Sequence, residues 1–339
     1  SRTALLQPSR ARSQKRGKGL MKIGLFTALF SKMSLDEVIR KVKLMGIRTL
    51  EIGAGNYPGN PHLKLDWLNS TAKLKEFKDK LDNHGMTISA LSCHGNPLHP
   101  NKSFSTICQE TARKTVLLAE KLGVTRVVDF SGCPGDSEAS KFPNWVTTPW
   151  PRDYLDVLEW QWEKKVIPYW KKFGKFAEDH GIKVAVEPHP GFVVYSPETM
   201  LRLRAEVGPV IGCNLDPSHM FWQGIDPCMA ARALGDAILH VHAKDVHLCA
   251  ANIAVNGVLD TKPYRDAKHR SWIFRAVGYG HGYDFWADFV STLRIAGYDD
   301  VLSIEHEDGL MSAEEGLAKA AAFLSQVIIK ESPSDAWWI

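Results

Sequence analysis

The feature that most constrains the fold of this chain is a regular alternation of short apolar runs with longer amphipathic segments. From Lys22 onward, eight runs rich in β-branched residues are each followed by a stretch with helical periodicity. Such alternation is typical of parallel strands joined by helical crossovers. The predicted strands are KIGLF (22–26), RTLEI (48–52), TISALSC (87–93), TRVVDF (125–130), IKVAVE (182–187), IGCNLD (211–216), AILHVHA (237–243) and DVLSIEH (300–306).

The predicted fold class is α/β, as a single-domain (β/α)8 TIM barrel over residues 21–330. Eight strand–helix units fit a closed barrel better than a doubly wound open sheet, which would carry a glycine-rich turn after its first strand. That turn reads FTALFSKMS, and the chain has no G-x-G-x-x-G or phosphate-loop motif. Ser34 and Glu37 form a capping-box pattern at the start of the first predicted helix.

Two connections are too long for ordinary turns between a strand and the next helix. They cover residues 131–152, after the fourth strand, and residues 246–280, after the seventh. Segments that follow barrel strands form the catalytic rim, so we predict two functional rim insertions. The first contains Trp145 and Trp150, whose aromatic faces suit the C–H faces of sugars. We predict a carbohydrate lid here, and the alternative is loop packing or a subunit contact.

The formal net charge of +4 does not describe the body of the chain. Of the 42 basic residues six lie within residues 1–20, which hold no acidic residue, so 36 basic and 38 acidic residues remain, a balance of −2. We predict a disordered basic tail over 1–20 and a C-terminal tail over 331–339. An extension ahead of a start at Met21, a transit-like segment and a nucleic-acid-binding arm stay open for the first tail. Because the chain outside residues 1–20 has a slight negative charge, we predict no nucleic-acid partner for it.

The sequence also bears on cellular location. It contains no run of eighteen apolar residues, and its first twenty residues lack the apolar centre of a secretory signal. We therefore predict a cytoplasmic protein without a membrane partner. The six cysteines are scattered without C-x-x-C spacing, which favours reduced thiols over a thiolate zinc site or a disulfide framework.

Side chains on a strand alternate between its two faces, so one parity of each barrel strand points to the barrel axis. On the seventh strand this rule groups Ile238, His240, His242 and Lys244 as inward and assigns Leu239, Val241 and Ala243 to the helices. The same rule turns Glu187, Asp216 and Glu305 inward at the ends of the fifth, sixth and eighth strands. Taken singly, each has a structural explanation as a hydrogen-bonded core histidine, a helix cap or an ion pair.

Together these residues indicate a metal site. Three carboxylates that converge at one barrel mouth would repel one another unless a cation held them, and three oxygen donors with one nitrogen donor suit a divalent ion. We therefore predict one divalent metal ion bound by Glu187, Asp216, His242 and Glu305. Mn²⁺ is the first choice, and Mg²⁺, Co²⁺ and Zn²⁺ are the alternatives.

The segments VAVEPHP, NLDPSHM, LHVHAKD and VGYGHGYDFWADFVSTLRIAGYDDVLSIEHED resemble the xylose isomerase-like superfamily of TIM barrels, the sugar phosphate isomerase/epimerase family. The resemblance covers residues 21 to about 327. It implies the same four ligands, with Glu187 and Glu305 doubling as the catalytic acid/base pair. It also implies that His219, in the LD-x-x-H pattern, touches the metal or the substrate.

The chain departs from the ketose 3-epimerase branch of this family, which would place a glutamate and an arginine where Val193 and Leu248 stand. Part of the substrate-fixing pattern of that branch is therefore missing. Inward parity makes His94, Glu51 and Lys244 further predicted substrate-binding residues. Buried structural roles or ion pairs are the alternatives for all three.

A metal ion would let a carboxylate remove a proton beside a carbonyl at neutral pH, because the ion stabilises the resulting enediolate. We predict a metal-dependent sugar isomerase or epimerase that acts on a keto sugar or glycoside. Because no phosphate-binding motif occurs, an unphosphorylated substrate is favoured. The expected partners are a small-molecule carbohydrate and a second copy of the chain in a homo-oligomer.

Other activities are compatible with parts of the same pattern. The first alternative is a β-eliminating lyase on 3-keto glycosides, similar to a C-glycoside deglycosidase subunit, which would need a partner subunit or a partner oxidoreductase. A distant alternative is an endonuclease IV-like nuclease. That nuclease needs further histidine and aspartate ligands, among them a D-x-H pair after the seventh strand, and we expect none between residues 243 and 300. Four intact ligands disfavour a non-catalytic sugar-binding barrel.

Overall fold

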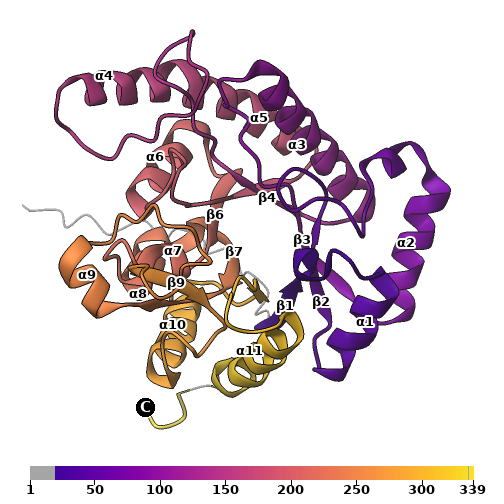
Figure 1. The fold of residues 1–339 in the computed structure, drawn as a ribbon. Coiled ribbons are helices and arrows are strands. Elements are labelled where there is room, and N and C mark those ends of the chain that lie inside the picture. Colours follow the sequence, from indigo (N-terminus) through magenta and orange to yellow (C-terminus); the bar gives the residue numbers. More distant parts are fainter. Residues whose placement is uncertain (1–19, 335) are drawn as a thin grey trace, which may run out of the picture.

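A computed structural model describes residues 20–334 and 336–339, so the predicted basic tail lies outside the described residues except for Leu20. Eight parallel strands close into a barrel in the order β1-β10-β7-β6-β5-β4-β3-β2, and helices surround them (Figure 1). The first and last strands close the barrel, with Lys22 paired with Val301. The predicted (β/α)8 barrel is confirmed.

All eight predicted strands are present, and each bound lies within two residues of its prediction. Asp216 and Glu305 directly follow their strands instead of ending them. The barrel strands are β1 (Lys22–Phe26), β2 (Thr49–Gly53), β3 (Thr87–Ser92), β4 (Arg126–Phe130), β5 (Lys183–Glu187), β6 (Ile211–Leu215), β7 (Ile238–Ala243) and β10 (Val301–Ile304).

Six of the eleven helices in the described residues begin at a residue whose side chain caps the first turn. At the first helix, the Ser34 hydroxyl accepts a hydrogen bond from the Glu37 backbone N–H and the Glu37 carboxylate accepts one from the Ser34 backbone N–H, as the capping box predicts. The helices are α1 (Leu35–Leu44), α2 (Thr71–Asn83), α3 (Lys102–Leu122), α4 (Asp153–Trp160), α5 (Ile167–Asp179), α6 (Pro197–Val207), α7 (Ser218–Phe221), α8 (Pro227–Leu234), α9 (Ala250–Asn256), α10 (Tyr283–Ile295) and α11 (Ala313–Val327).

The main hydrophobic core lies between the outer faces of the strands and the helices that cover them. Its largest members are Trp162, Trp170 and Trp286, which are at most 1% exposed. A side chain of this size contributes several kcal/mol to folding by leaving water, so the helical ring is the main source of stability. This rigid outer layer leaves the barrel interior free to carry polar groups.

A small apolar layer of Ala90, Val128, Ala185 and Leu239 lies inside the barrel. Leu239 was predicted to face the helices, and that prediction is wrong. Between β6 and β7 the register moves from Cys213↔Ile238 to Asn214↔His240, so one extra residue bulges there and the parity changes across it. Ile238 consequently joins the outer core, whereas His240 keeps its predicted inward face.

The close packing of Leu239 explains the glycine opposite it on β6. A Cβ atom added to Gly212 would lie 2.5 Å from the Leu239 Cγ atom and 2.4 Å from the Ala237 carbonyl oxygen. Because these contacts are too short for any side chain, only glycine allows the bulged strand to approach. The bulge therefore fixes how the strand that carries His240 and His242 sits in the barrel.

The two rim insertions differ in structure. The first, residues 131–152, carries no helix or strand, whereas the second folds into α9 and a two-stranded antiparallel sheet of β8 (Asp245–Leu248) and β9 (Trp272–Arg275), on the lower left side of Figure 1. Trp145 of the first insertion packs against a cluster of the second that contains Trp272 and Phe274. The insertions thus support each other. Among the described residues, no helix combines the length and apolar character needed to span a membrane.

Candidate metal centre

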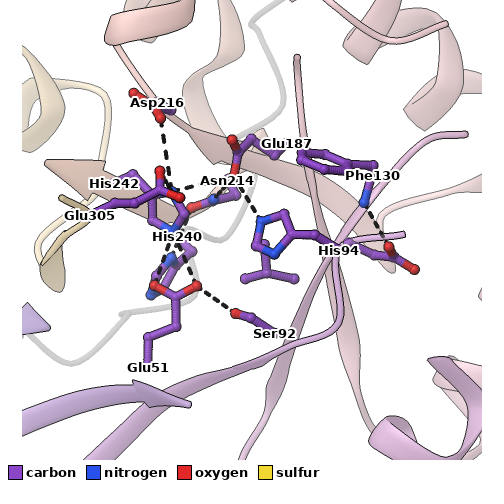
Figure 2. A network of polar contacts seen from close by, with 12 residues as sticks. Glu51, Ser92, His94, Phe130, Glu187, Asn214, Asp216, His240, His242 and Glu305 are labelled. Atoms are coloured by element: carbon purple, nitrogen blue, oxygen red, sulfur yellow. Dashed lines mark hydrogen bonds and ion pairs between the residues drawn. The ribbon is translucent and has the colours of Figure 1, made fainter. Parts of the chain in front are cut away.

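Four side chains from four neighbouring strands converge at the carboxyl end of the barrel (Figure 2). They are Glu187, Asp216, His242 and Glu305, and each offers a ligand atom within 4.8 Å of the others. His242 Nδ1 lies 3.1 Å from Glu305 Oε2, 3.3 Å from Glu187 Oε2 and 4.0 Å from Asp216 Oδ2. An ion with bonds of about 2.0–2.2 Å separates neighbouring ligand atoms by roughly 3 Å, so this spacing is close to that of a metal site.

Two of the ligand atoms lack hydrogen bonds. His242 Nδ1 and Asp216 Oδ2 are buried and have no hydrogen-bond partner, although Asp216 Oδ2 lies in an ion pair with Lys244. Buried polar atoms nearly always have a partner, and both of these atoms face the same point as the two glutamates. Three carboxylates and one imidazole form a donor set suited to a divalent ion such as Mn²⁺, Mg²⁺ or Zn²⁺. The residues therefore fit the predicted ion.

Glu51, predicted to bind substrate, instead lies beneath the ligands. It is fully buried, and its two carboxylate oxygens lie 3.0 and 2.9 Å from His242 Nε2. The hydroxyls of Ser92 and Ser303 donate to the same carboxylate, at 2.5 and 2.7 Å. The imidazole thus presents Nδ1 to the site and points Nε2–H at a carboxylate, the usual arrangement behind a metal-binding histidine.

Charge and burial compete at this centre. Burial raises the pKa of Glu51, but attraction to His242 and His240 together with the hydrogen bonds from His242 and Ser303 lowers it to about 2. Burial lowers the pKa of His242, and the surrounding carboxylates, Glu51 first, raise it well above its usual value. Burial also raises the pKa of Asp216, to about 6, against the attraction of Lys244. The cluster is therefore a site where added positive charge is strongly favourable.

Three other predicted residues contact the ligand set. His94 Nε2 lies 2.9 Å from Glu187 Oε2. His219 is fully buried, with Nε2 at 3.3 Å from Glu187 Oε1 and 3.4 Å from Asp216 Oδ2. Lys244 Nζ lies 2.7 Å from Glu305 Oε2 and 3.0 Å from Asp216 Oδ2. His94, His219 and Lys244 thus lie around the four candidate ligands, and their role in substrate binding stays a prediction.

A cavity of about 390 Å³ opens above this centre. It is large enough for a small ligand of monosaccharide size. Its floor is polar and its walls are largely aromatic, with Trp145 and Trp150 absent from both. The lining residues are Phe26, Ala28, Tyr57, Pro58, His94, Phe130, Glu187, His189, Phe192, Lys244, Glu305 and Glu307.

The two tryptophans of the predicted lid, Trp145 and Trp150, therefore do not line the cavity. Trp145 packs against the second insertion, with its ring 5.6 Å from the ring of Tyr195, and Trp150 is 79% exposed. The aromatic residues at the cavity come instead from β1, β4 and loops near the barrel mouth. Val193, which replaces the epimerase glutamate, is buried, and Leu248, which replaces the arginine, lies on β8. Neither lines the cavity.

Sequence reasoning missed three polar residues near the site. Asn214 Nδ2 donates to Glu187 Oε2 at 2.8 Å, and Glu307 Oε2 accepts from Lys244 at 2.9 Å. His189 Nδ1 lies 2.7 Å from the Pro190 carbonyl oxygen, which can only accept, so Nδ1 carries the hydrogen and Nε2 is an acceptor. The sequence contains a signal for each of the three. Asn214 has the same strand parity as Asp216, and Glu307 has the same parity as Glu305. His189 lies in the VAVEPHP segment.

The chain does contain a D-x-H pair after the seventh strand, at Asp245 and His247, so the prediction that none occurs there is wrong. Its side chains do not join the ligands. The Asp245 carboxylate is buried and accepts hydrogen bonds from the Gly278 backbone N–H at 3.0 Å and the Trp286 indole N–H at 3.2 Å. His247 is exposed on β8. Asp245 alone holds the segment before α10 in place, and the pair supplies no second metal site.

Comparison with known proteins agrees with the fold. Residues 39–327 match the family described as Xylose isomerase-like TIM barrel. The chain is 42% identical to the protein YfiH of Bacillus subtilis (strain 168), over 91% of this chain and 99% of that protein. It is 29% identical to the rhizopine catabolism protein MocC of Rhizobium meliloti, over 53% of this chain and 55% of that protein.

Solved structures share the fold at lower identity. The IolI protein with a bound zinc atom aligns with a TM-score of 0.62 at 17% identity, over 91% of this chain and 98% of that one. A D-tagatose 3-epimerase-like protein aligns with a TM-score of 0.60 at 21% identity and the same coverage. With the family match over residues 39–327, the observations establish that the chain belongs to the xylose isomerase-like TIM barrel family.

Proposed function

We propose that this protein is a divalent-metal-dependent isomerase or epimerase that acts on a keto sugar or a related neutral polyhydroxy ketone. The observation that carries the proposal is the placement of two carboxylates. Glu187 and Glu305 line one cavity, and each lies within 3.3 Å of the unpartnered nitrogen of His242. Family membership supports the proposal, as do the epimerase-like and zinc-containing proteins among the structural neighbours.

Glu187, Asp216, His242 and Glu305 would hold the ion. Bound there, it would supply a Lewis acid that stabilises negative charge on substrate oxygens next to the carbon that loses a proton. The chain's own residues do the proton transfer. One of Glu187 and Glu305 accepts the proton from carbon, and the other returns a proton to the opposite face or to the neighbouring carbon.

The two glutamates have different hydrogen-bond partners, which suits two carboxylates with separate roles in proton transfer. Glu187 Oε2 accepts hydrogen bonds from Asn214 and lies against His94, which fix the carboxylate and keep it ionised. Glu305 Oε2 accepts a hydrogen bond from the ammonium group of Lys244, whose positive charge keeps this carboxylate ionised. The two carboxylates therefore approach one substrate from different strands with different partners.

The charges around the cavity support an uncharged substrate. Three carboxylates line it, those of Glu187, Glu305 and Glu307, against the single ammonium of Lys244, which contacts two of them. Even with the proposed divalent ion, these three carboxylates and Asp216 outnumber the charges of the ion and Lys244 by one, so a phosphate or carboxylate group would meet no excess of positive charge. The rings of Phe26, Tyr57, Phe130 and Phe192 offer apolar faces to the C–H side of a sugar-like ring. His189 Nε2 offers an acceptor for a hydroxyl.

The experiment is to incubate the Mn²⁺-loaded protein with a panel of ketoses and 3-keto glycosides in D2O and to follow deuterium uptake by NMR. We expect deuterium at a carbon next to a carbonyl, with formation of an isomer or epimer. Glu187→Gln should reduce the exchange rate 10²–10⁴-fold, because it removes a proton acceptor. Glu198→Gln, at an exposed position on α6, is the matched control and should exchange like the native protein.

Two outcomes would count against the proposal. Release of an aglycone from a 3-keto glycoside, with formation of an unsaturated keto sugar, would assign the protein to the lyase alternative. Exchange that survives removal of metal by a chelator would show that the ion plays no part in proton transfer. Activity that is lost on chelation and restored by Mn²⁺ supports the isomerase or epimerase assignment.

A further inference from the structure

We propose that His240 and Asn214 form a positioning pair whose task is to hold Glu187 in the orientation that binds metal and accepts a proton. The inference rests on the proposed function for the role of Glu187. All three side chains point into the barrel from adjacent strands, β5, β6 and β7 (Figure 2). His240 Nδ1 lies 2.8 Å from Asn214 Oδ1, and Asn214 Nδ2 lies 2.8 Å from Glu187 Oε2.

The Glu187 carboxylate sets the direction of both hydrogen bonds in the series from Glu187 through Asn214 to His240. An ionised carboxylate only accepts, so the amide NH2 of Asn214 must face Glu187. The amide oxygen of Asn214 then faces His240, and because that oxygen also only accepts, His240 must carry a hydrogen on Nδ1. The other ring nitrogen, Nε2, lies 3.1 Å from the Ser89 hydroxyl. The orientation of Asn214 is thus determined from both sides.

The fold brings these residues together through irregular strand pairing. The register between β6 and β7 skips Leu239, so that Asn214 stands opposite His240. The register between β2 and β3 skips Ser89, the residue whose hydroxyl meets His240 Nε2. Bulges of this kind re-aim side chains at functional sites. Without the first bulge Leu239 would stand opposite Asn214, and the amide oxygen would lose its donor.

The pair does not belong to the cavity wall. His240 and Asn214 are both fully buried, and neither lines the cavity above the metal ligands. Within the described part of the chain, their hydrogen bonds connect them to one another, to Ser89 and to Glu187, and a ring nitrogen of His240 also lies within 4.8 Å of atoms of Glu51 and His242. Two apolar side chains of similar shape would fill this space without any need for matched hydrogen bonds. The polar pair therefore acts through Glu187.

The test compares two substitutions that keep different nitrogens of His240. An asparagine amide nitrogen lies close to the place of histidine Nδ1, and a glutamine amide nitrogen close to that of Nε2. His240→Asn thus retains the donor to Asn214, whereas His240→Gln removes it and keeps the contact with Ser89. We expect His240→Asn to bind Mn²⁺ within about threefold of the native protein and His240→Gln to bind it 10–100-fold more weakly, measured by isothermal titration calorimetry.

Deuterium exchange of a substrate gives the second readout. For His240→Gln we expect a lower kcat at nearly unchanged KM, because the cavity wall is intact while Glu187 turns more freely. Near-ultraviolet circular dichroism establishes that each variant is folded. Should His240→Gln fail to fold, Asn214→Leu leaves His240 in place and carries the same prediction of 10–100-fold weaker Mn²⁺ binding.

The outcomes separate this inference from the proposed function. If both His240 variants bind Mn²⁺ equally well or equally poorly, the positioning role is wrong, whatever the native protein catalyses. If the native protein binds Mn²⁺ and the variants follow the expected order, but no ketose exchanges deuterium, the positioning role stands and the proposed function fails. If the native protein binds no Mn²⁺, both are overturned.

Discussion

Asp129 offers a quantitative test of how burial shapes this barrel. It lies on β4 with its side chain only 1% exposed. Its Oδ1 accepts hydrogen bonds from the backbone N–H groups of Gly95 and Phe130, at 2.9 and 2.8 Å, but its Oδ2 has no partner. Burial raises the pKa of Asp129 from 3.8 to about 7, against the attraction of His94 and these hydrogen bonds. The folded protein therefore resists ionisation of this group.

The sign and size of the effect follow from linkage. Below pH 3.8 the carboxyl is protonated in both the folded and the unfolded state, and it costs nothing. As the pH rises from 3.8 toward 7, the unfolded state ionises first, so the free energy of unfolding falls. With these two pKa values the loss between pH 5 and pH 8 is about 2.5 kcal/mol. Asp129→Asn keeps both backbone hydrogen bonds and removes the titration.

The assay is urea denaturation of the metal-free native protein and of Asp129→Asn at pH 5 and pH 8. Coincident fluorescence and circular-dichroism transitions establish that unfolding is two-state. The stability of Asp129→Asn relative to the native protein should rise by about 2.5 kcal/mol from pH 5 to pH 8. Other titrating groups are common to both proteins and cancel in this comparison. A difference that is the same at both pH values would refute the reasoning.

Three further predictions concern the centre, the cavity and the core. Glu51→Gln should weaken Mn²⁺ binding 10–100-fold in calorimetry, because the amide no longer fixes the His242 ring with a full charge; native affinity would contradict the supporting role of Glu51. Phe192→Ala should raise KM for the exchanging ketose roughly 5–20-fold with little change in kcat, since it removes an apolar wall, and an unchanged KM would place the substrate elsewhere. Trp162→Ala should lower the free energy of unfolding by about 3–5 kcal/mol in urea and leave Mn²⁺ affinity intact, so a large loss of affinity would show that the core and the site are not separable.

The strands and the ligand set were predictable because they depend on local periodicity. Parity along single strands turns Glu187 and His242 inward without knowledge of any neighbouring strand, and closure of the barrel then brings them together. The capping box at Ser34 is likewise local. Features of this kind can be derived from a few residues and a standard geometry.

Features that depend on strand register could not be derived in this way. The bulge at Leu239 turns that side chain into the barrel against its parity, and it depends on the register with β6, where Gly212 leaves room for the side chain. The role of Glu51 follows from a contact with His242, 191 residues away in sequence. Trp145 and Trp150 have a composition that suits a lid, but their surroundings depend on how the second insertion folds. Tertiary contacts determine all three.

The central claim is that Glu187, Asp216, His242 and Glu305 bind one divalent ion. Its most direct test is a crystal structure of the protein grown with Mn²⁺, with anomalous diffraction data collected at the manganese absorption edge. We predict one strong anomalous peak within about 2.0–2.3 Å of an atom from each of the four side chains. An anomalous peak bound by other residues, or no peak among these four when Mn²⁺ is in excess, would contradict the claim.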